Sequence, residues 1–125
     1  MAGERILVVD DEEPIVALLG EVLGAEGYAV DSARDAAQAL ALIRESMYDA
    51  ALIDFNLPDM NGVMLHRQIR QMDEELAGRT IFMSGFLQSE ADLGYYVAES
   101  AGFLGKPFDL REVVEHVRRV LAGAS

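Results

Sequence analysis

The sequence lacks several features that would each point to a particular class of protein. It has no cysteine, which excludes disulfides and thiolate metal sites and leaves the compartment undetermined by redox chemistry. Basic residues are scarce: 10 Lys and Arg stand against 22 Asp and Glu, for a formal net charge of -12. Because a protein that binds a phosphate backbone needs a basic face, we expect no direct nucleic-acid partner. No apolar run approaches the roughly 18 residues of a membrane span, and the N-terminus has no apolar signal core, so we expect a cytoplasmic protein with no membrane partner.

The composition is sufficient for one hydrophobic core. The 125 residues are the usual size of a single domain, and 51% of them are hydrophobic. No internal repeat, low-complexity tract or linker divides the chain. We therefore expect one domain over residues 1–125, with its core at about 4–122.

Short apolar runs alternate with helical patterns along the chain. The runs are 5–9, 28–33, 50–53, 80–83 and 102–104. Apolar residues at 3.6-residue spacing predict helices over 15–23 and 110–121, and weaker patterns lie at about 63–71 and 91–99. Strands that alternate with helices form βαβ units, so the sequence predicts an α/β fold with a parallel sheet covered by helices on both faces.

Several predicted helices carry ordinary end signals. Pro14 suits a first helical turn, and Gly27 suits the end of the same helix. Two pairs have the spacing of a capping box with an aspartate cap, Asp35 with Gln38 and Asp109 with Glu112.

Polar residues stand where four of the predicted strands end. Ligands of open parallel sheets bind at the carboxyl ends of the strands, so these side chains are expected to converge on one edge. Three carboxylates, a hydroxyl and an ammonium suit a hard divalent cation, most simply Mg²⁺, with a phosphoryl group beside it. The residues are Asp10 and Asp11, Asp54, Ser84, and Lys106 before Pro107.

Four motifs in order along the chain resemble those of response regulator receiver domains, which act in two-component signalling. They are VVDDEEP, IDFNLPDMNG, FMSGF and AGFLGKPF. The resemblance covers essentially the whole chain. It implies a flavodoxin-like (βα)5 three-layer sandwich whose five parallel strands have the order 2-1-3-4-5. It also implies a cis bond between Lys106 and Pro107.

The resemblance implies a role for each residue of the acidic edge. Asp54 would be the phospho-acceptor, receiving phosphate from a sensor histidine kinase or a histidine phosphotransfer protein. Mg²⁺ would be held directly by Asp11, largely through water by Asp10, and also by Asp54 and the backbone carbonyl of Asn56. Lys106 and Ser84 would each bind a phosphoryl oxygen. Such a protein catalyses only its own phosphorylation and dephosphorylation and is not otherwise an enzyme.

The resemblance further implies a conformational switch. The hydroxyl of Ser84 would move toward the phosphoryl group, and Phe103 would turn inward behind it. The readout face would comprise the helix at about 91–99, the strand at 102–104 and the helix at 110–121. This face would bind a downstream protein target and is a candidate surface for a homodimer. The partly apolar side chains that this face offers a partner are those of Leu93, Tyr95, Tyr96 and Val97. Phe86 and Asn56 are expected to affect how fast water hydrolyses the phosphorylated aspartate.

Other interpretations of the same residues remain open from sequence. Asp10 and Asp11 could simply cap the first helix, and His66 and His116 are expected to have plain surface or packing roles. The rival functions are a haloacid-dehalogenase-type phosphatase, a flavin-binding module and a receiver that is never phosphorylated. We expect no effector domain after residue 122, so that output goes through protein contact, or the chain is a piece of a longer regulator or hybrid kinase.

Overall fold

The strands form one parallel sheet in the expected order. The computed structural model describes residues 3–85 and 101–123. The sheet has the order β2-β1-β3-β4-β5, and every neighbouring pair is parallel. The α/β class and the strand order are therefore confirmed. The strands are β1 (Arg5–Val9), β2 (Ala29–Ala33), β3 (Ala50–Asp54), β4 (Thr80–Ser84) and β5 (Gly102–Gly105).

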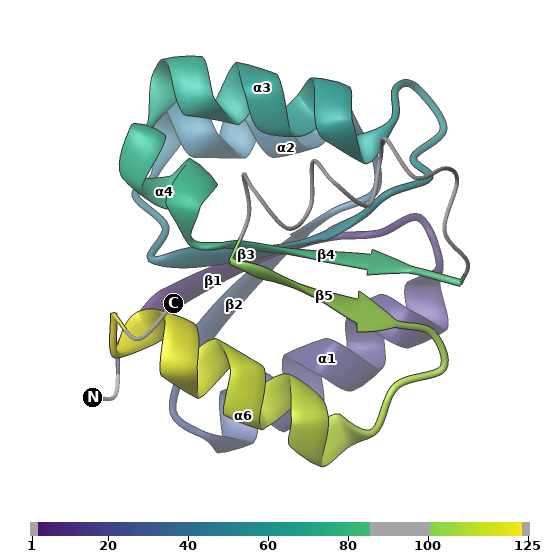
Figure 1. Ribbon diagram of the computed structural model, residues 1–125, viewed down its shortest axis with the longest axis vertical. Coiled ribbons are helices and arrows are strands. Elements are labelled where there is room, and N and C mark those ends of the chain that lie inside the picture. Colours follow the sequence, from purple (N-terminus) through teal and green to yellow (C-terminus); the bar gives the residue numbers. More distant parts are fainter. Residues whose placement is uncertain (1–2, 86–100, 124–125) are drawn as a thin grey trace.

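Helices cover both faces of the sheet, which makes three layers (Figure 1). On one face lie α1 (Glu13–Ala25) and α6 (Leu110–Leu121). The other face is covered by α2 (Ala36–Glu45), α3 (Gly62–Met72) and the short α4 (Glu74–Gly78). The sequence did not predict α4, and the helix expected at about 91–99 lies outside the described residues. No helix within the described part of the chain is both long and apolar enough to cross a membrane.

The sheet separates two hydrophobic clusters, because its strands are apolar at consecutive positions. In β1, Leu7 and Val9 face the cluster under α2 and α3, whereas Ile6 and Val8 face the cluster over α1 and α6. All four are fully buried. Each such side chain contributes roughly 1.5–3 kcal/mol by its removal from water. This burial fixes the register of the central strands and, with it, the position of their polar ends.

The helix ends are capped largely as predicted. The carboxylate of Asp35 accepts from the backbone N–H of Gln38 at 2.8 Å, while the Gln38 side chain accepts from the N–H of Arg34. Asp109 also caps its helix, although its bond is to the N–H of Arg111. Gly27 follows α1 with a φ of 97°, a conformation that glycine adopts without steric cost. These caps fix where each helix starts beside the sheet.

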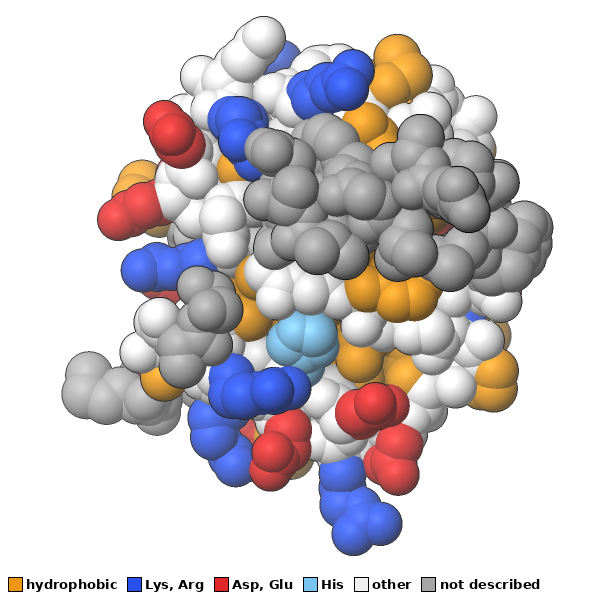
Figure 2. Space-filling view, in the orientation of Figure 1, with side chains coloured by type: hydrophobic (Ala, Val, Ile, Leu, Met, Phe, Trp, Pro, Cys, Tyr) orange, Lys and Arg blue, Asp and Glu red, His pale blue; other side chains and the backbone are white. Residues whose placement is uncertain are grey.

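One face of the molecule carries both charged and apolar side chains (Figure 2). Figure 2 shows hydrophobic side chains gathered near β5, and acidic and basic side chains over α6. The interspersed charges on α6 include an ion pair to the residue that follows α1, in which Arg118 lies 2.9 Å from Glu26. Surface pairs of this kind contribute at most about 1 kcal/mol each.

Candidate functional site

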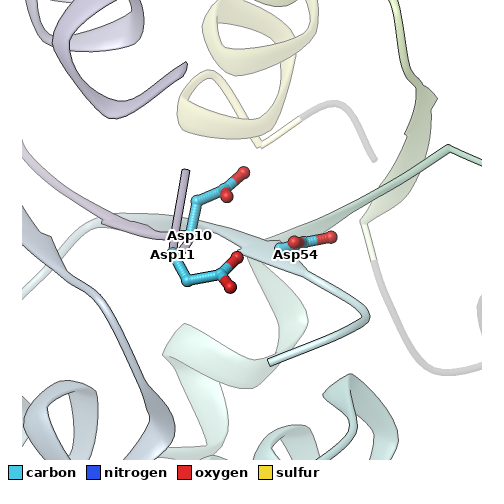
Figure 3. A group of neighbouring side chains, drawn as sticks. All are labelled: Asp10, Asp11 and Asp54. Carbon is cyan, nitrogen blue, oxygen red and sulfur yellow. The ribbon is translucent and has the colours of Figure 1, made fainter. Parts of the chain in front are cut away.

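Three carboxylates meet at the carboxyl edge of the sheet (Figure 3). Asp10 and Asp11 follow β1, and Asp54 ends β3, the strand that pairs directly with β1. One oxygen of each carboxylate lies within 4.8 Å of the others. Asp10 is fully buried and Asp54 is 5% exposed, whereas Asp11 is exposed. At about 4 Å and an effective dielectric near 20, two like charges repel by about 4 kcal/mol, so this cluster requires a positive charge.

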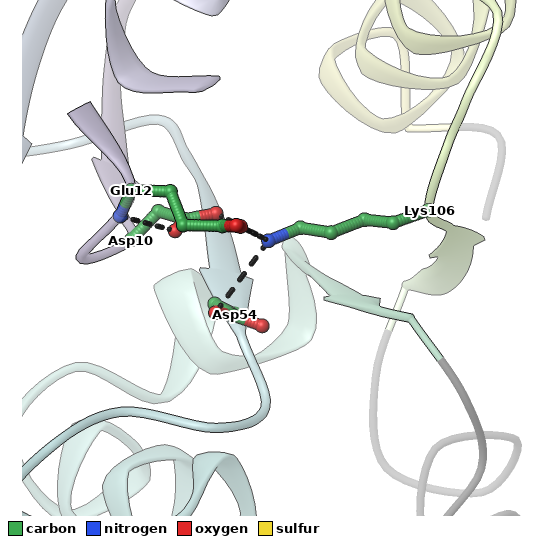
Figure 4. A network of polar contacts seen from close by, with 4 residues as sticks. All are labelled: Asp10, Glu12, Asp54 and Lys106. Atoms are coloured by element: carbon green, nitrogen blue, oxygen red, sulfur yellow. Dashed lines mark hydrogen bonds and ion pairs between the residues drawn. The ribbon is translucent and has the colours of Figure 1, made fainter. Parts of the chain in front are cut away.

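Lys106 supplies one positive charge from the end of β5 (Figure 4). Its Nζ lies 2.8 Å from Oδ2 of Asp10, 2.9 Å from Oε2 of Glu12 and 3.5 Å from Oδ2 of Asp54. The backbone N–H of Lys106 donates to the carbonyl of Ser84 at 2.8 Å, which fixes the start of this side chain beside β4. The Lys106–Pro107 bond is cis, as expected.

The environment shifts the pKa values of two groups in the site. Burial, together with the charge of Asp10, raises the pKa of Asp54 to about 6, although Lys106 and a backbone N–H of Asn56 oppose the shift. Burial alone would lower the pKa of Lys106, but hydrogen bonds to Asp10 and Glu12 outweigh it and raise that pKa. Asp54 is thus mostly a carboxylate at neutral pH, but its burial and the charge of Asp10 disfavour this ionised form. A bound cation would stabilise it.

The acids line an open cleft that could admit a small charged group. The cleft has a volume of about 550 Å³. Three carboxylates contact the one ammonium, and a fourth, that of Asp11, clusters with Asp10 and Asp54, so Lys106 alone does not balance their charge. Oxygen donors with excess negative charge are the ligands of hard divalent cations such as Mg²⁺. The cleft is lined by Asp11, Glu12, Ile15, Asp54, Asn56, Gly85, Lys106 and Pro107.

Asp10 does more than cap the first helix. The N-cap residue of α1 is Glu12, whose side chain makes no capping bond. Asp10 accepts from the N–H of Glu12 with one oxygen, at 2.9 Å, and from Lys106 with the other. It therefore joins the start of α1 to the end of β5.

Ser84 and Phe103 lie in neighbouring strands. Ser84 ends β4 and is 1% exposed, and Phe103 is partly buried in β5 opposite Phe82. Phe103 packs against the cluster on the α2 and α3 side of the sheet. The remaining residues expected near the switch lie outside the described residues: Phe86, Leu93, Tyr95, Tyr96 and Val97.

The two histidines are not part of the acidic site. His66 is fully buried, with a ring nitrogen 2.7 Å from the carbonyl oxygen of Ala77 and its ring edge-on to Phe82. His116 is partly buried beside the carbonyl of Ala101. Both positions agree with packing roles.

Sequence reasoning assigned no role to two acids that the structure connects to the site. Glu12 belongs to the run of four acids after β1, but only the structure shows its carboxylate on Lys106. Asp59 lies in the loop after Asp54, and its carboxylate accepts from the N–H groups of Ala36 and Ala37. Both contacts join segments far apart in sequence, so spacing gave no signal for either.

Comparisons with known proteins agree on one family. Residues 6–118 match the family model described as response regulator receiver domain. The chain is 32% identical over 126 residues to the sporulation initiation phosphotransferase F of Bacillus subtilis, covering 97% of this chain and 96% of that protein. It is also 36% identical over 121 residues to the transcriptional regulatory protein ResD of the same species. That match covers 97% of this chain but 49% of ResD, so the chain spans about half of that relative's length.

Solved structures show the same similarity. A CheY-like receiver domain protein from Methanospirillum hungatei aligns with a TM-score of 0.90 at 28% identity, covering 98% of this chain and 97% of that one. The response regulator protein TrrA from Thermotoga maritima, solved in complex with Mg²⁺ and BeF, aligns with a TM-score of 0.80 at 31% identity. That alignment covers 94% of this chain and 98% of TrrA.

Proposed function

The chain belongs to the response regulator receiver domain family, and from this premise we propose that Asp54 is the residue that accepts the phosphoryl group. The family acts in two-component signalling, in which a receiver domain is phosphorylated on an aspartate. The observation that carries the proposal is the position of Asp54 between two other carboxylates and Lys106. Membership of this family also decides against the phosphatase and flavin-binding alternatives.

The site fits a divalent cation. Receiver domains bind Mg²⁺ at an acidic pocket. Here Asp11 would hold Mg²⁺ directly and Asp10 largely through water, with further oxygens from Asp54 and the carbonyl of Asn56. The raised pKa of Asp54 supports this assignment, since burial and then the charge of Asp10 disfavour its ionised form, and Lys106 does not fully offset them. When bound, the ion would neutralise charge on the oxygens of the transferred phosphoryl group.

Asp54 would act as the nucleophile in the transfer. A carboxylate oxygen attacks the phosphorus of a phosphohistidine, so that an O–P bond forms as the N–P bond breaks. The electron pair of the N–P bond leaves with the histidine nitrogen. Because Asp54 has a pKa of about 6, most of its carboxyl groups are ionised and nucleophilic at neutral pH. The chain would act on its own phosphoryl group alone and not on a separate substrate.

Lys106 and Ser84 would bind oxygens of the phosphoryl group. The ammonium of Lys106 is 3.5 Å from Oδ2 of Asp54, so it would be near the oxygens of a phosphoryl group on that residue. Ser84 has a hydroxyl that would donate to another oxygen. Contacts made only after phosphorylation shift the population toward a second conformation, with Phe103 turning inward behind Ser84.

The altered face would comprise β5, α6 and the segment at about 91–99. The hydrophobic side chains near β5 in Figure 2 support protein binding here, because exposed apolar area is a common feature of interaction surfaces. Receiver domains interact with histidine kinases or phosphotransfer proteins and with downstream effectors. We infer a cytoplasmic protein whose downstream target, or a second copy of the chain, binds to this face.

Incubation with acetyl phosphate and Mg²⁺, followed by intact mass measurement, tests the proposed function. We expect one phosphoryl group on the wild type and none on Asp54→Asn. Asp49→Asn is the matched control: Asp49 accepts from the N–H of Arg5 at the amino end of β1, and asparagine keeps that acceptor. An unmodified wild type, or phosphate that survives Asp54→Asn, would overturn the proposal. The first outcome would favour a receiver that is never phosphorylated.

A further inference from the structure

Asp59 connects the loop after β3 to the start of α2. Its Oδ1 accepts from the backbone N–H of Ala36 at 2.9 Å, and its Oδ2 accepts from that of Ala37 at 3.0 Å. These N–H groups belong to the first turn of α2, where no intrahelical acceptor is available. A carboxylate is favoured at a helix start because the N–H groups and the helix dipole both attract negative charge. Accordingly, the bonds from Ala36 and Ala37 help lower the pKa of Asp59 below its usual range.

The loop that contains Asp59 also contains two residues of the acidic site. It begins at Asp54, passes Asn56 and ends where α3 starts at Gly62. Its base is held by backbone hydrogen bonds, from Phe55 N–H to the carbonyl of Met83 and from Gly62 N–H to that of Phe55. Asp59 lies at the exposed tip, three residues after Asn56.

The segment between β2 and α2 contacts both acidic loops. The carbonyl of Ala33 accepts from the backbone N–H of Asp10 at 3.0 Å. Ala36 and Ala37 donate to Asp59 a few residues later. One short segment is therefore hydrogen-bonded both to the loop that carries Asp10 and to the loop that carries Asn56.

We propose that Asp59 is a positioning residue, which anchors the Asp54–Gly62 loop to α2 and so holds the Asn56 carbonyl in place for the cation. This inference rests on the proposed cation site. Asp59 does not line the cleft and acts through the loop backbone. Because coupling between two sites is reciprocal, cation binding also stabilises the start of α2.

Titration of the protein with Mn²⁺, followed by electron paramagnetic resonance of the free ion, tests this role. Mn²⁺ takes the same oxygen ligands as Mg²⁺ and gives a dissociation constant directly. Loss of a residue that orients a metal ligand usually weakens metal binding by about 10–100-fold. Since Asp59 acts through a loop, we expect Asp59→Ala to weaken Mn²⁺ binding by about 3–10-fold. Asp59→Asn keeps one acceptor oxygen, so its affinity for Mn²⁺ should lie between those of Asp59→Ala and the wild type.

Asp35→Ala is the matched control. Asp35 caps the same helix through the N–H of Gln38, and its loss removes the same charge without touching the loop. Both alanine variants should lower the melting temperature, but Asp35→Ala should bind Mn²⁺ within about twofold of the wild type. As a second readout, Mg²⁺ should shift the amide resonances of Ala36 and Ala37 in the wild type and not in Asp59→Ala.

Each outcome of the titration has a distinct meaning. Wild-type affinity in Asp59→Ala would overturn the positioning role and leave the proposed function intact. Equal weakening by Asp35→Ala would also overturn it, because helix stability or charge would then explain the effect. A wild type that binds no Mn²⁺ would instead overturn the cation site on which the inference rests.

Discussion

The Nζ of Lys106 lies 2.8 Å from Oδ2 of Asp10, although 96 positions separate the two residues in sequence. This ion pair is shorter than the 3.5 Å contact between Lys106 and Asp54. Glu12 holds the same ammonium at 2.9 Å. A phosphoryl group on Asp54 would therefore compete with two carboxylates for Lys106. Exchange of partners by this one side chain would connect the modified residue to the start of α1 and the end of β5.

Replacing Lys106 with methionine should slow phosphorylation. Methionine keeps the length of the side chain but removes the ammonium that would bind a phosphoryl oxygen. Loss of one such donor typically costs about 100-fold or more in rate. We expect a decrease of that order in the initial rate of phosphorylation by acetyl phosphate, measured by intact mass. Glu12→Gln, which removes the negative charge of one Lys106 partner and keeps the ammonium, should change the rate by less than about tenfold. Equal rates in the wild type and Lys106→Met would contradict this role.

Asp54→Asn should stabilise the metal-free protein at neutral pH. The folded protein raises the pKa of Asp54 from 3.8 to about 6, so the folded state binds the proton more tightly than the unfolded state does. The contribution of Asp54 to the free energy of unfolding therefore falls as the pH rises through the window from about 4 to 6. Removing the ionised carboxylate should raise the free energy of unfolding by on the order of 1–3 kcal/mol at about pH 7.5. Urea unfolding with a chelator measures the difference.

The pH dependence of that difference provides the control. Near pH 4, where Asp54 is largely protonated in the folded protein, Asp54→Asn and the wild type should have nearly the same stability. A stabilisation that is equal at both pH values would mean that the charge of Asp54 is not its cause.

Magnesium should stabilise the wild type through Asp11. A ligand that binds only the folded state adds about 1.4 kcal/mol at ten times its dissociation constant. Because Asp11 is exposed, its replacement by alanine should cost little stability in the absence of the metal. Thermal unfolding with and without Mg²⁺ should thus show a rise in melting temperature for the wild type and a much smaller rise for Asp11→Ala. A rise of the same size in both proteins would place the ion elsewhere.

The fold could be predicted from sequence because its strands are short apolar runs between regular helical patterns. The run over 5–9 matches β1, and the other strands differ from their predicted ranges by one residue at one end. The strand order came from the family resemblance. The helix α4 was missed because its five residues are too few to show a helical period. Its cap, in which Asp73 accepts from the N–H of Leu76, was the available signal.

The members of the acidic site could be predicted, but not the contacts among them. Asp10, Asp54 and Lys106 each stand at the carboxyl end of a different strand, and a parallel sheet brings such positions to one edge. Which acids Lys106 contacts depends on how its side chain crosses the cleft. The bonds from Asp59 to α2 depend on the packing of two loops that lie more than 20 residues apart. Neither arrangement follows from local spacing or periodicity.

Gly62→Ala should destabilise the protein through the loop that holds Asn56. A Cβ at this position would lie 3.0 Å from the Cα of Phe55 and 3.0 Å from a ring carbon of Phe82. Overpacking of this kind typically costs about 1–3 kcal/mol, which urea unfolding would measure. Gly20→Ala, in α1, is the control because, apart from its chain neighbours and the backbone of its own helix, no atom of the described residues lies within 4 Å of its added Cβ. The free energy of unfolding of that variant should rise by up to about 1 kcal/mol, because alanine favours a helix more than glycine does. Equal effects of the two changes would contradict the close approach at Gly62.

The phenol of Tyr48 should ionise well above the usual range for tyrosine. Its hydroxyl donates to Oδ2 of Asp31 at 2.7 Å, and only 5% of the residue is exposed. Burial, this hydrogen bond and the charge of Asp31 raise the pKa of Tyr48 from 10.0 to about 12. Of the four tyrosines, this one should therefore appear as a late step in the phenolate absorbance of the folded protein, and Tyr48→Phe should remove that step.

The same shift gives a stability test with a defined sign. A phenol whose pKa is higher in the folded state stabilises the protein below pH 10, and that contribution is lost as the pH rises through about 12. Loss of a hydrogen bond to a charged group costs about 1.5–3 kcal/mol. Tyr48→Phe should therefore lower the free energy of unfolding by about that amount near pH 8, and the difference from the wild type should shrink above pH 10. A difference that stays constant across this window would show that lost packing, and not the bond to Asp31, accounts for the effect.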